Sequence, residues 1–158
     1  MRKLIFAISL LIISGMAASA QSHGYVLIAP GGLSGSGYTN GVYHIGVGAD
    51  AVFWRGLGFS PEVGYVTGTT SNFQDGFGLG SLNGTYHFAR RNRLDPFVTG
   101  GYSIIFRSGH VNLANFGGGV NWWFLKRLGL KLEFRDHVDV QNGGNFHLWQ
   151  GRFGLTFR

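Results

Sequence analysis

The stretch that decides the fold closes the chain: "FHLWQGRFGLTFR", residues 146–158. Along one face of this stretch lie Trp149, Gly151, Phe153, Leu155 and Phe157, and between them lie Gln150, Arg152, Gly154 and Thr156. A period of two with unlike faces is typical of a β-strand. The aromatic face points either into a core or out into an apolar surrounding, and the rest of the chain has to decide between the two.

Similar alternation recurs along the chain. It predicts strands near 23–33, 41–53, 57–67, 76–88, 96–107, 114–124, 128–139 and 146–157. These segments exceed the usual length of a soluble strand and suffice for a tilted strand to cross a bilayer.

The connections between these segments alternate in chemistry. Tight, basic connections lie at 54–58, 90–95 and 125–129, whereas connections made of Gly, Ser, Thr and Asn lie at 34–41, 68–76, 108–113 and 140–145. Strict alternation places one kind at each end of a meander. The pattern predicts an all-β fold, an eight-stranded antiparallel up-and-down transmembrane β-barrel.

The first twenty residues have the layout of a secretory signal peptide. Arg2 and Lys3 precede an apolar run from Leu4 to Ile13, and the segment closes on Ala18-Ser19-Ala20. We therefore expect residues 1–20 to be cleaved and residues 21–158 to form one exported barrel domain. The chain has no cysteine, which excludes disulfides, thiolate metal sites and a cysteine nucleophile. After residue 20 no apolar run is long enough for a membrane-spanning helix.

The sorting of apolar and polar residues predicts which face meets which surrounding. In segment 128–139, Leu130, Leu132 and Phe134 share one face, and Lys131 and Glu133 share the other. An eight-stranded lumen is barely wide enough to be filled by side chains, so it does not accommodate so many large apolar groups. We expect the aromatic face to meet lipid, and a soluble calyx with the reverse arrangement is the alternative. The predicted lipid-facing residues are Trp122, Phe124, Phe134, Trp149, Phe153 and Phe157. The faces of segments 23–33 and 76–88 are less clearly sorted.

The polar face carries charges that need partners inside a narrow barrel, because an isolated buried charge is costly. The predicted interior network comprises Asp50, Glu62, Lys131, Glu133, Arg135 and Arg152, and Arg107 is assigned to the same face. Asn142-Gly143 is a strong two-residue hairpin signal, and a turn there sets Glu133 opposite Arg152. Such a network plugs the barrel, and a proton or ion path is the less favoured interpretation.

Three stretches of the sequence resemble a known family. "DPFVTGGYSIIF" (95–106), "FGGGVNWWFLKRLGLKLEFRDH" (116–137) and the closing "GRFGLTFR" resemble the small bacterial outer-membrane β-barrel domain family, whose relatives include the OmpA membrane domain and OmpX-like proteins. The resemblance covers 21–158 and implies location in the outer membrane of a Gram-negative bacterium. It also implies recognition of the last strand by the barrel-insertion machinery through a terminal aromatic residue. Phe157 matches that signal, although Arg158 follows it.

Some barrels of this kind are lipid-modifying enzymes that use Ser or His near the rim, so such side chains are candidates for chemistry here. The candidates are His23, His44, His87, His110, His137, His147, Ser103 and Ser108, of which His44, His110, His137 and His147 are expected near the outer rim. No HExxH or GxSxG motif accompanies them. The sequence therefore predicts no enzymatic activity, no cofactor and no metal site. It predicts instead a structural or surface-interaction role with a narrow polar interior rather than an open, porin-like pore; a rim-site acyl hydrolase or acyltransferase is the alternative.

Basic residues gather in the tight connections. These are Arg55, Arg90, Arg91, Arg93, Lys126 and Arg127, in a chain with a formal net charge of +6. An exported protein rarely meets nucleic acid, whereas anionic lipid headgroups lie at the level of a barrel rim. We expect a periplasmic basic rim in contact with membrane lipids, no nucleic-acid partner, and a monomer.

Overall fold

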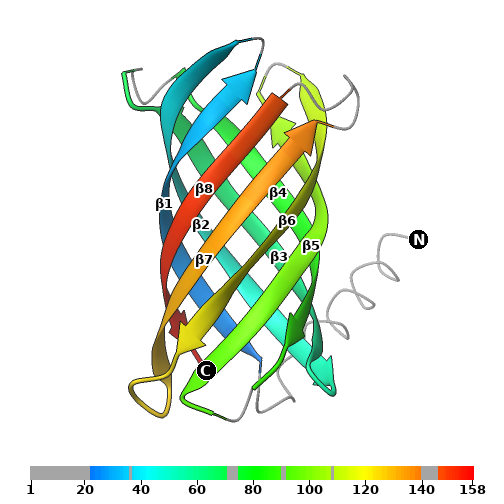
Figure 1. Cartoon of the computed structure of the whole chain (residues 1–158), viewed down its shortest axis with the longest axis vertical. Coiled ribbons are helices and arrows are strands. Elements are labelled where there is room, and N and C mark those ends of the chain that lie inside the picture. Colours follow the sequence, from blue (N-terminus) through cyan, green and yellow to red (C-terminus); the bar gives the residue numbers. More distant parts are fainter. Residues whose placement is uncertain (1–21, 36, 71–74, 90–91, 108, 140–145) are drawn as a thin grey trace, which may run out of the picture.

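The computed structural model describes residues 22–35, 37–70, 75–89, 92–107, 109–139 and 146–158. It is a closed barrel in which each antiparallel strand pairs with the next along the chain and the last pairs with the first (Figure 1). The strands are β1 His23–Gly35, β2 Tyr38–Trp54, β3 Leu57–Gly68, β4 Phe77–His87, β5 Leu94–Phe106, β6 His110–Trp122, β7 Leu128–Asp139 and β8 Phe146–Phe157. The predicted eight-stranded up-and-down fold is confirmed. The predicted signal peptide lies outside the described residues.

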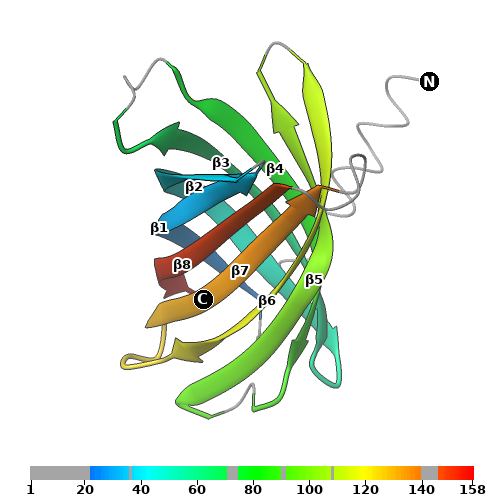
Figure 2. The same cartoon turned by 45° about the horizontal axis from the view of Figure 1, so that its top comes forward.

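The strands are inclined to the barrel axis and wind around it, as Figures 1 and 2 show. The β2–β3, β4–β5 and β6–β7 connections lie at the end of the barrel that also holds the C-terminus, and we call this end the basic rim. The other four connections form the opposite end, the loop rim. Within the described residues no helix is long and apolar enough to cross a membrane.

Two connections at the loop rim are shorter than the sequence predicts. β1 and β2 stay paired out to Ser34↔Thr39 and Gly35↔Tyr38, and β6 begins at His110. Polar residues there continue the strands, because the hydrogen-bonded ladder extends past the band in which apolar residues alternate with polar ones. The connections predicted at 34–41 and 108–113 are therefore mostly strand.

The two faces of the sheet are sorted as the period of two predicts. In β7, Lys131, Glu133 and Arg135 are buried inside, whereas Leu132 and Phe134 are exposed on the outer wall. The barrel thus has a polar core and an apolar surface, which is the reverse of a soluble domain.

The strands that the sequence left unsorted have inward positions of mixed chemistry. β1 turns Tyr25, Leu27 and Ala29 inward, while Val26 and Ile28 point outward, so both of its faces are apolar. β4 turns Leu79 inward together with polar residues such as Ser81 and Asn83, and three of its outward positions are glycines. The alternation in β1 is weak because its inward residues are aromatic or aliphatic rather than charged.

Close approach of side chains explains part of the high glycine content. A Cβ on Gly48 would lie 2.5 Å from the Tyr25 hydroxyl oxygen and 2.9 Å from the carbonyl oxygen of Pro61. Tyr25 therefore occupies the space that a side chain at position 48 would fill. In a lumen this narrow, each large inward group needs a small neighbour.

The register of the last hairpin positions the charged residues. Glu133 pairs with Arg152, and Arg135 pairs with Gln150. The predicted Glu133–Arg152 register is confirmed, while the Asn142-Gly143 turn from which it was derived lies outside the described residues.

Candidate functional site

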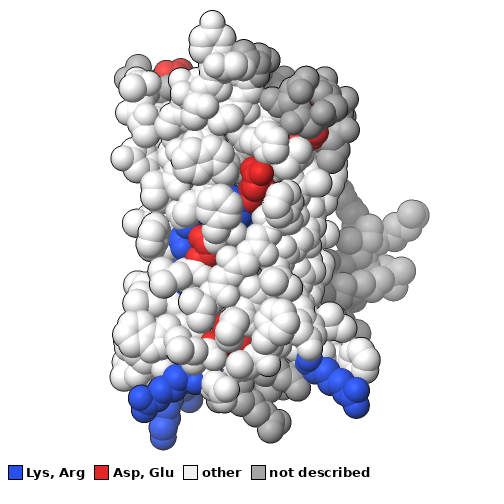
Figure 3. Space-filling model, viewed as in Figure 1, with Lys and Arg blue, Asp and Glu red and all other residues white. Residues whose placement is uncertain are grey.

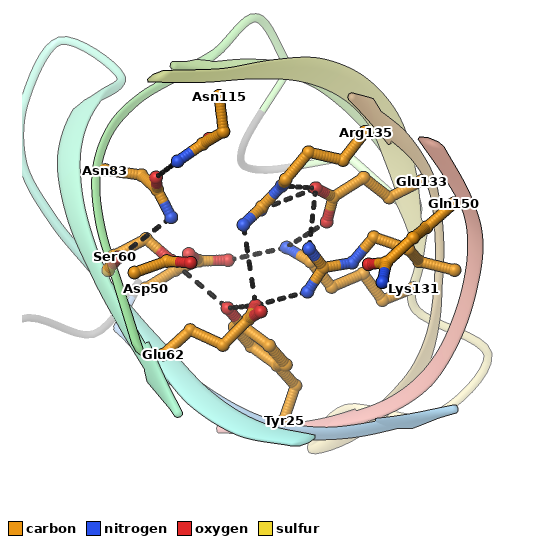
Figure 4. Close-up of polar contacts among 12 residues, drawn as sticks. Tyr25, Asp50, Ser60, Glu62, Asn83, Asn115, Lys131, Glu133, Arg135 and Gln150 are labelled. Atoms are coloured by element: carbon orange, nitrogen blue, oxygen red, sulfur yellow. Dashed lines mark hydrogen bonds and ion pairs between the residues drawn. The ribbon is translucent and has the colours of Figure 1, made fainter. Parts of the chain in front are cut away.

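The centre of the lumen is organised around the carboxylate of Glu62 on β3. Its Oε2 atom accepts short hydrogen bonds from Arg152 and, at 2.7 Å, from the Tyr25 hydroxyl, and it lies 3.6 Å from Arg135. Tyr25 comes from β1, Arg152 from β8 and Arg135 from β7. Side chains from opposite sides of the barrel therefore meet at this carboxylate (Figure 4).

A second part of the network joins β2 to β7. Lys131 Nζ donates to Asp50 Oδ2 at 2.9 Å and lies 3.9 Å from Glu133 Oε2, and Arg135 binds Glu133 at 2.5 Å. The ammonium group also lies 4.0 Å above the ring centre of Phe97. Ion pairs and the face of an aromatic ring together replace the water that Lys131 loses on burial.

The structure thus brings together all six residues that the sequence assigns to the interior. They are Asp50, Glu62, Lys131, Glu133, Arg135 and Arg152, and none is more than 6% exposed. Three acids face three bases, so the group is balanced in charge. These charges are paired with one another across the middle of the lumen.

One residue assigned to the polar face lies elsewhere. Arg107 follows the end of β5 at the loop rim, where its guanidinium lies 3.6 Å from Asp75, and both side chains are 55% exposed. The assignment of Arg107 to the interior was wrong, because the strand ends before the alternation reaches this residue.

The far side of the lumen carries neutral polar groups that the sequence did not single out. Asn115 donates to Asn83 at 2.7 Å and to Ser103 at 2.8 Å, and Ser103 in turn bonds Ser81 at 2.8 Å. Asn83 and Asn115 point into the barrel from β4 and β6 (Figure 4). Their inward position on the strands was the sequence signal that could have identified them. It was missed because a buried neutral side chain, unlike a buried charge, does not require an oppositely charged partner.

Toward the loop rim the lumen holds two histidines and then an apolar layer. His44 lies 3.1 Å from Gln150, and His137 lies 3.2 Å from the carbonyl oxygen of Leu148. Both rings are fully buried. The sequence places both near the outer rim, and the structure has them on the loop-rim side of the lumen, where inward alternation buries them. The layer beyond consists of Val42, Val66, Leu79, Leu113 and Leu148.

At the basic rim the lumen ends in two contacts between a histidine and an aspartate. His23 lies 3.0 Å from Asp50, and His87 lies 2.8 Å from Asp95. The His23 ring meets the rings of His87 and Trp123 edge-on. These buried groups close the lumen at the basic rim.

The remaining rim candidates are dispersed. Ser103 lies inside the barrel, Ser108 lies outside the described residues, and His110 is exposed at the start of β6. His147 faces outward on β8, where its Nδ1 atom lies 2.9 Å from Asp136 Oδ2 on β7. The sequence did not single out Asp136, although the predicted register of this hairpin sets it diagonally beside His147. Within the described residues, no group of three or more potential metal ligands is placed to hold an ion.

The outer wall carries the six residues that the sequence assigns to the lipid-facing side. Trp122, Phe124, Phe134, Trp149, Phe153 and Phe157 are each 41–57% exposed. Phe124 lies just past the end of β6, in the β6–β7 connection.

The basic rim is basic in the structure as well. Arg55, Arg93, Lys126 and Arg127 are exposed there, and Figure 3 shows Lys and Arg side chains gathered at the lower end of the barrel. Arg90 and Arg91 lie outside the described residues. Arg55 and Gly56 form the β2–β3 turn with φ of 46° and 100°, the left-handed pair typical of a two-residue type I′ hairpin.

Comparison with known proteins places the fold. No family model and no curated protein matches the sequence. The solved structures that resemble the chain include neisserial surface protein A (TM-score 0.64, 13% identity, covering 87% of this chain and 96% of that one). The N-terminal β-barrel domain of Pseudomonas aeruginosa OprF matches with TM-score 0.58 and 18% identity over 84% and 96% of the two chains. The outer membrane enzyme PagL matches with TM-score 0.57 and 15% identity over 85% and 99%. The chain therefore has the fold of a small bacterial outer-membrane β-barrel, the fold that its sequence resemblance implied.

Proposed function

We propose that the chain is an integral outer-membrane protein with a sealed lumen, which acts through its surface rather than by transport. The observation that carries the proposal is the reversal of polarity described above. An outer wall of exposed aromatic and aliphatic side chains suits lipid, and a lumen of paired charges does not suit a soluble calyx for apolar ligands. A structural or surface-interaction role follows from this arrangement.

Sealing of the lumen is supported at three levels along the barrel. The Glu62-centred network lies across the middle, the apolar layer of Val42, Val66, Leu79, Leu113 and Leu148 closes the loop-rim side, and the His23 and His87 pairs close the basic rim. An ion that moved through the lumen would have to break buried ion pairs and to lose its hydration beside apolar side chains. We therefore expect no conducting path.

The basic rim supports a definite orientation. Arg55, Arg93, Lys126 and Arg127 are exposed, and the Arg55 guanidinium lies 5.5 Å from the centre of the Trp54 ring. Basic and aromatic side chains together suit the headgroup level of a membrane. We place this rim at the periplasmic leaflet, with anionic phospholipids as its partners.

The last strand supports a role in assembly. Phe157 points outward, whereas Arg158 folds back: its Nε atom donates to the carbonyl oxygen of Lys126 at 3.0 Å, and its guanidinium lies 4.1 Å above the Trp123 ring centre. The extra residue is thus withdrawn from the lipid side. We propose that Phe157 still serves as the terminal aromatic signal for the insertion machinery.

The experiment that tests the proposal is fractionation of the producing cell. We expect recovery with the outer membrane, extraction only by detergent, and a folded band that migrates differently on a gel before and after boiling. Light scattering in detergent should give the mass of a monomer. Recovery as a soluble periplasmic protein would contradict the proposed membrane location.

A double variant compared in two lipids tests the lipid role of the basic rim. Reversing charge in K126E/R127E should slow folding into vesicles of phosphatidylglycerol and leave folding into phosphatidylcholine vesicles unchanged. Equal rates for the variant and the parent in both lipids would refute the lipid role of the basic rim.

A further inference from the structure

The outer wall carries a close contact between a carboxylate and an imidazole in a place where lipid contact is expected. Asp136 on β7 and His147 on β8 lie 2.9 Å apart, with side-chain exposures of 17% and 44%. Of the acidic residues in the described strands, Asp136 alone faces outward, and every Lys and Arg within those strands faces the lumen. A carboxylate on a wall that meets lipid is costly to maintain and therefore indicates function.

The geometry of the pair is that of an oriented general base. Asp136 binds the Nδ1 side of the imidazole, so a ring that donates from Nδ1 has its lone pair on Nε2. A carboxylate that fixes the ring in this way also stabilises the imidazolium that forms when Nε2 takes a proton. The pair thus supplies the base and the orienting acid of a hydrolytic site, and it lacks a nucleophile on the same two strands.

The closing seam of the barrel supplies that nucleophile. Ser34 on β1 is the direct cross-strand partner of His147 on β8, so both side chains lie on the outer face. Side chains of such partners start about 5 Å apart at their Cβ atoms. The Ser34 hydroxyl is bonded at 3.0 Å to that of Thr39, its partner on β2. Rotation about the Cα–Cβ bond of Ser34 turns its hydroxyl toward His147, and catalytic hydrogen bonds of this kind often close only when substrate binds.

The surroundings point to a lipid ester as the substrate. Ser34 and His147 are each the second residue from the loop-rim end of their strands, which is the level of headgroups and ester carbonyls. Trp149, the next outward residue on β8, lies against Gly32 immediately below the site. Farther along β1 and β8 the same wall is hollowed into an apolar groove lined by Ile28 and Phe153. A carbonyl held at Ser34 would thus have its acyl chain running down an apolar wall.

We propose that Ser34, His147 and Asp136 form an esterase site that removes an acyl chain from a membrane lipid at the outer leaflet. The Ser34 oxygen bonds to the ester carbonyl carbon while His147 Nε2 takes the hydroxyl proton. The lipid alcohol leaves with that proton, and an acyl-Ser34 remains. Water, activated by the same histidine, then releases the fatty acid and restores the serine. This inference rests on the proposed membrane location, and it would make the chain an enzyme, contrary to the expectation from sequence alone.

The test uses the full mature chain folded in detergent micelles, with p-nitrophenyl decanoate as the probe. We expect hydrolysis by the parent protein and a loss of at least about a hundredfold in S34A and H147Q, the range of general-base and nucleophile removal. H110Q, at an exposed histidine of the same rim outside the pair, is the matched control and should retain the parent rate. A fluorophosphonate should label the peptide that contains Ser34 in the parent and not in H147Q.

Heat-modified gel mobility verifies that each variant is folded, so loss of activity is not mistaken for loss of structure. A folded parent that hydrolyses the ester no faster than S34A, or activity that survives in S34A, would overturn the site. Such a result leaves the membrane location intact, because fractionation tests that separately. Recovery from the periplasm would instead overturn the membrane location on which the site depends.

Discussion

Replacing Glu62 by Gln removes the one carboxylate at which Arg152, Arg135 and Tyr25 converge. The substitution keeps the size of the side chain and deletes only its charge. Three buried bases then face two buried acids, so one guanidinium loses its main partner. Removing one partner of a buried ion pair typically costs about 3–5 kcal/mol, and the contacts of Glu62 place E62Q in that range.

The assay is equilibrium unfolding by urea of the barrel in phosphatidylcholine vesicles. Tryptophan fluorescence follows the transition, and linear extrapolation gives the free energy of unfolding. The matched control is D75N, which deletes the charge of the exposed Arg107–Asp75 pair. Because both of its side chains are 55% exposed, we expect that control to cost less than about 1 kcal/mol.

The double variant E62Q/R152Q makes the test sharper. It restores the balance of buried charge, so it should cost less than the sum of E62Q and R152Q, with a coupling of about 0.5–3 kcal/mol. Equal costs for E62Q and D75N, or strict additivity in the double variant, would refute the view that Glu62 holds the network together.

Three further outcomes follow from the fold. G48V should destabilise the barrel by about 1–3 kcal/mol, because its side chain would overlap Tyr25 and the Pro61 carbonyl. The control is G84A, whose Cβ would meet nothing closer than 3.8 Å and whose stability should lie within about 1 kcal/mol of the parent. Unfolding in vesicles compares the two variants. F134R, at a wall position that is 57% exposed, should cost about 2–4 kcal/mol in vesicles, and a neutral effect there would argue against lipid contact. Planar bilayers that contain the folded protein should show no unitary conductance, and reproducible channels would disprove the sealed lumen.

Side-chain alternation was enough to predict most of the architecture. In β7 it separates Lys131 and Glu133 from Leu132 and Phe134, because a barrel wall has two unlike surroundings and a strand has a period of two. The Asn-Gly hairpin signal also set Glu133 opposite Arg152, since a two-residue turn leaves a single register.

Contacts across the lumen were beyond the reach of this reasoning. Arg152 pairs most closely with Glu62 on β3, whereas its ladder neighbour Glu133 lies 3.9 Å away. Register relates only adjacent strands, while the curvature of the closed sheet decides which side chains meet across it. For the same reason the contact between His44 on β2 and Gln150 on β8 required the three-dimensional structure.

The seam between β1 and β8 has a consequence for how the barrel is made. It joins the two ends of the described chain, with Gly24 paired to Phe157. It is therefore the strand pairing of greatest sequence separation, and we expect it to form last. Until it forms, the sheet has two unpaired edges whose amide and carbonyl groups cannot be satisfied by lipid. A half-built barrel would therefore need a temporary partner along β8, the strand whose terminal aromatic residue is the proposed recognition signal. Completion of the seam would release that partner, so that closure of the sheet itself ends the assembly reaction.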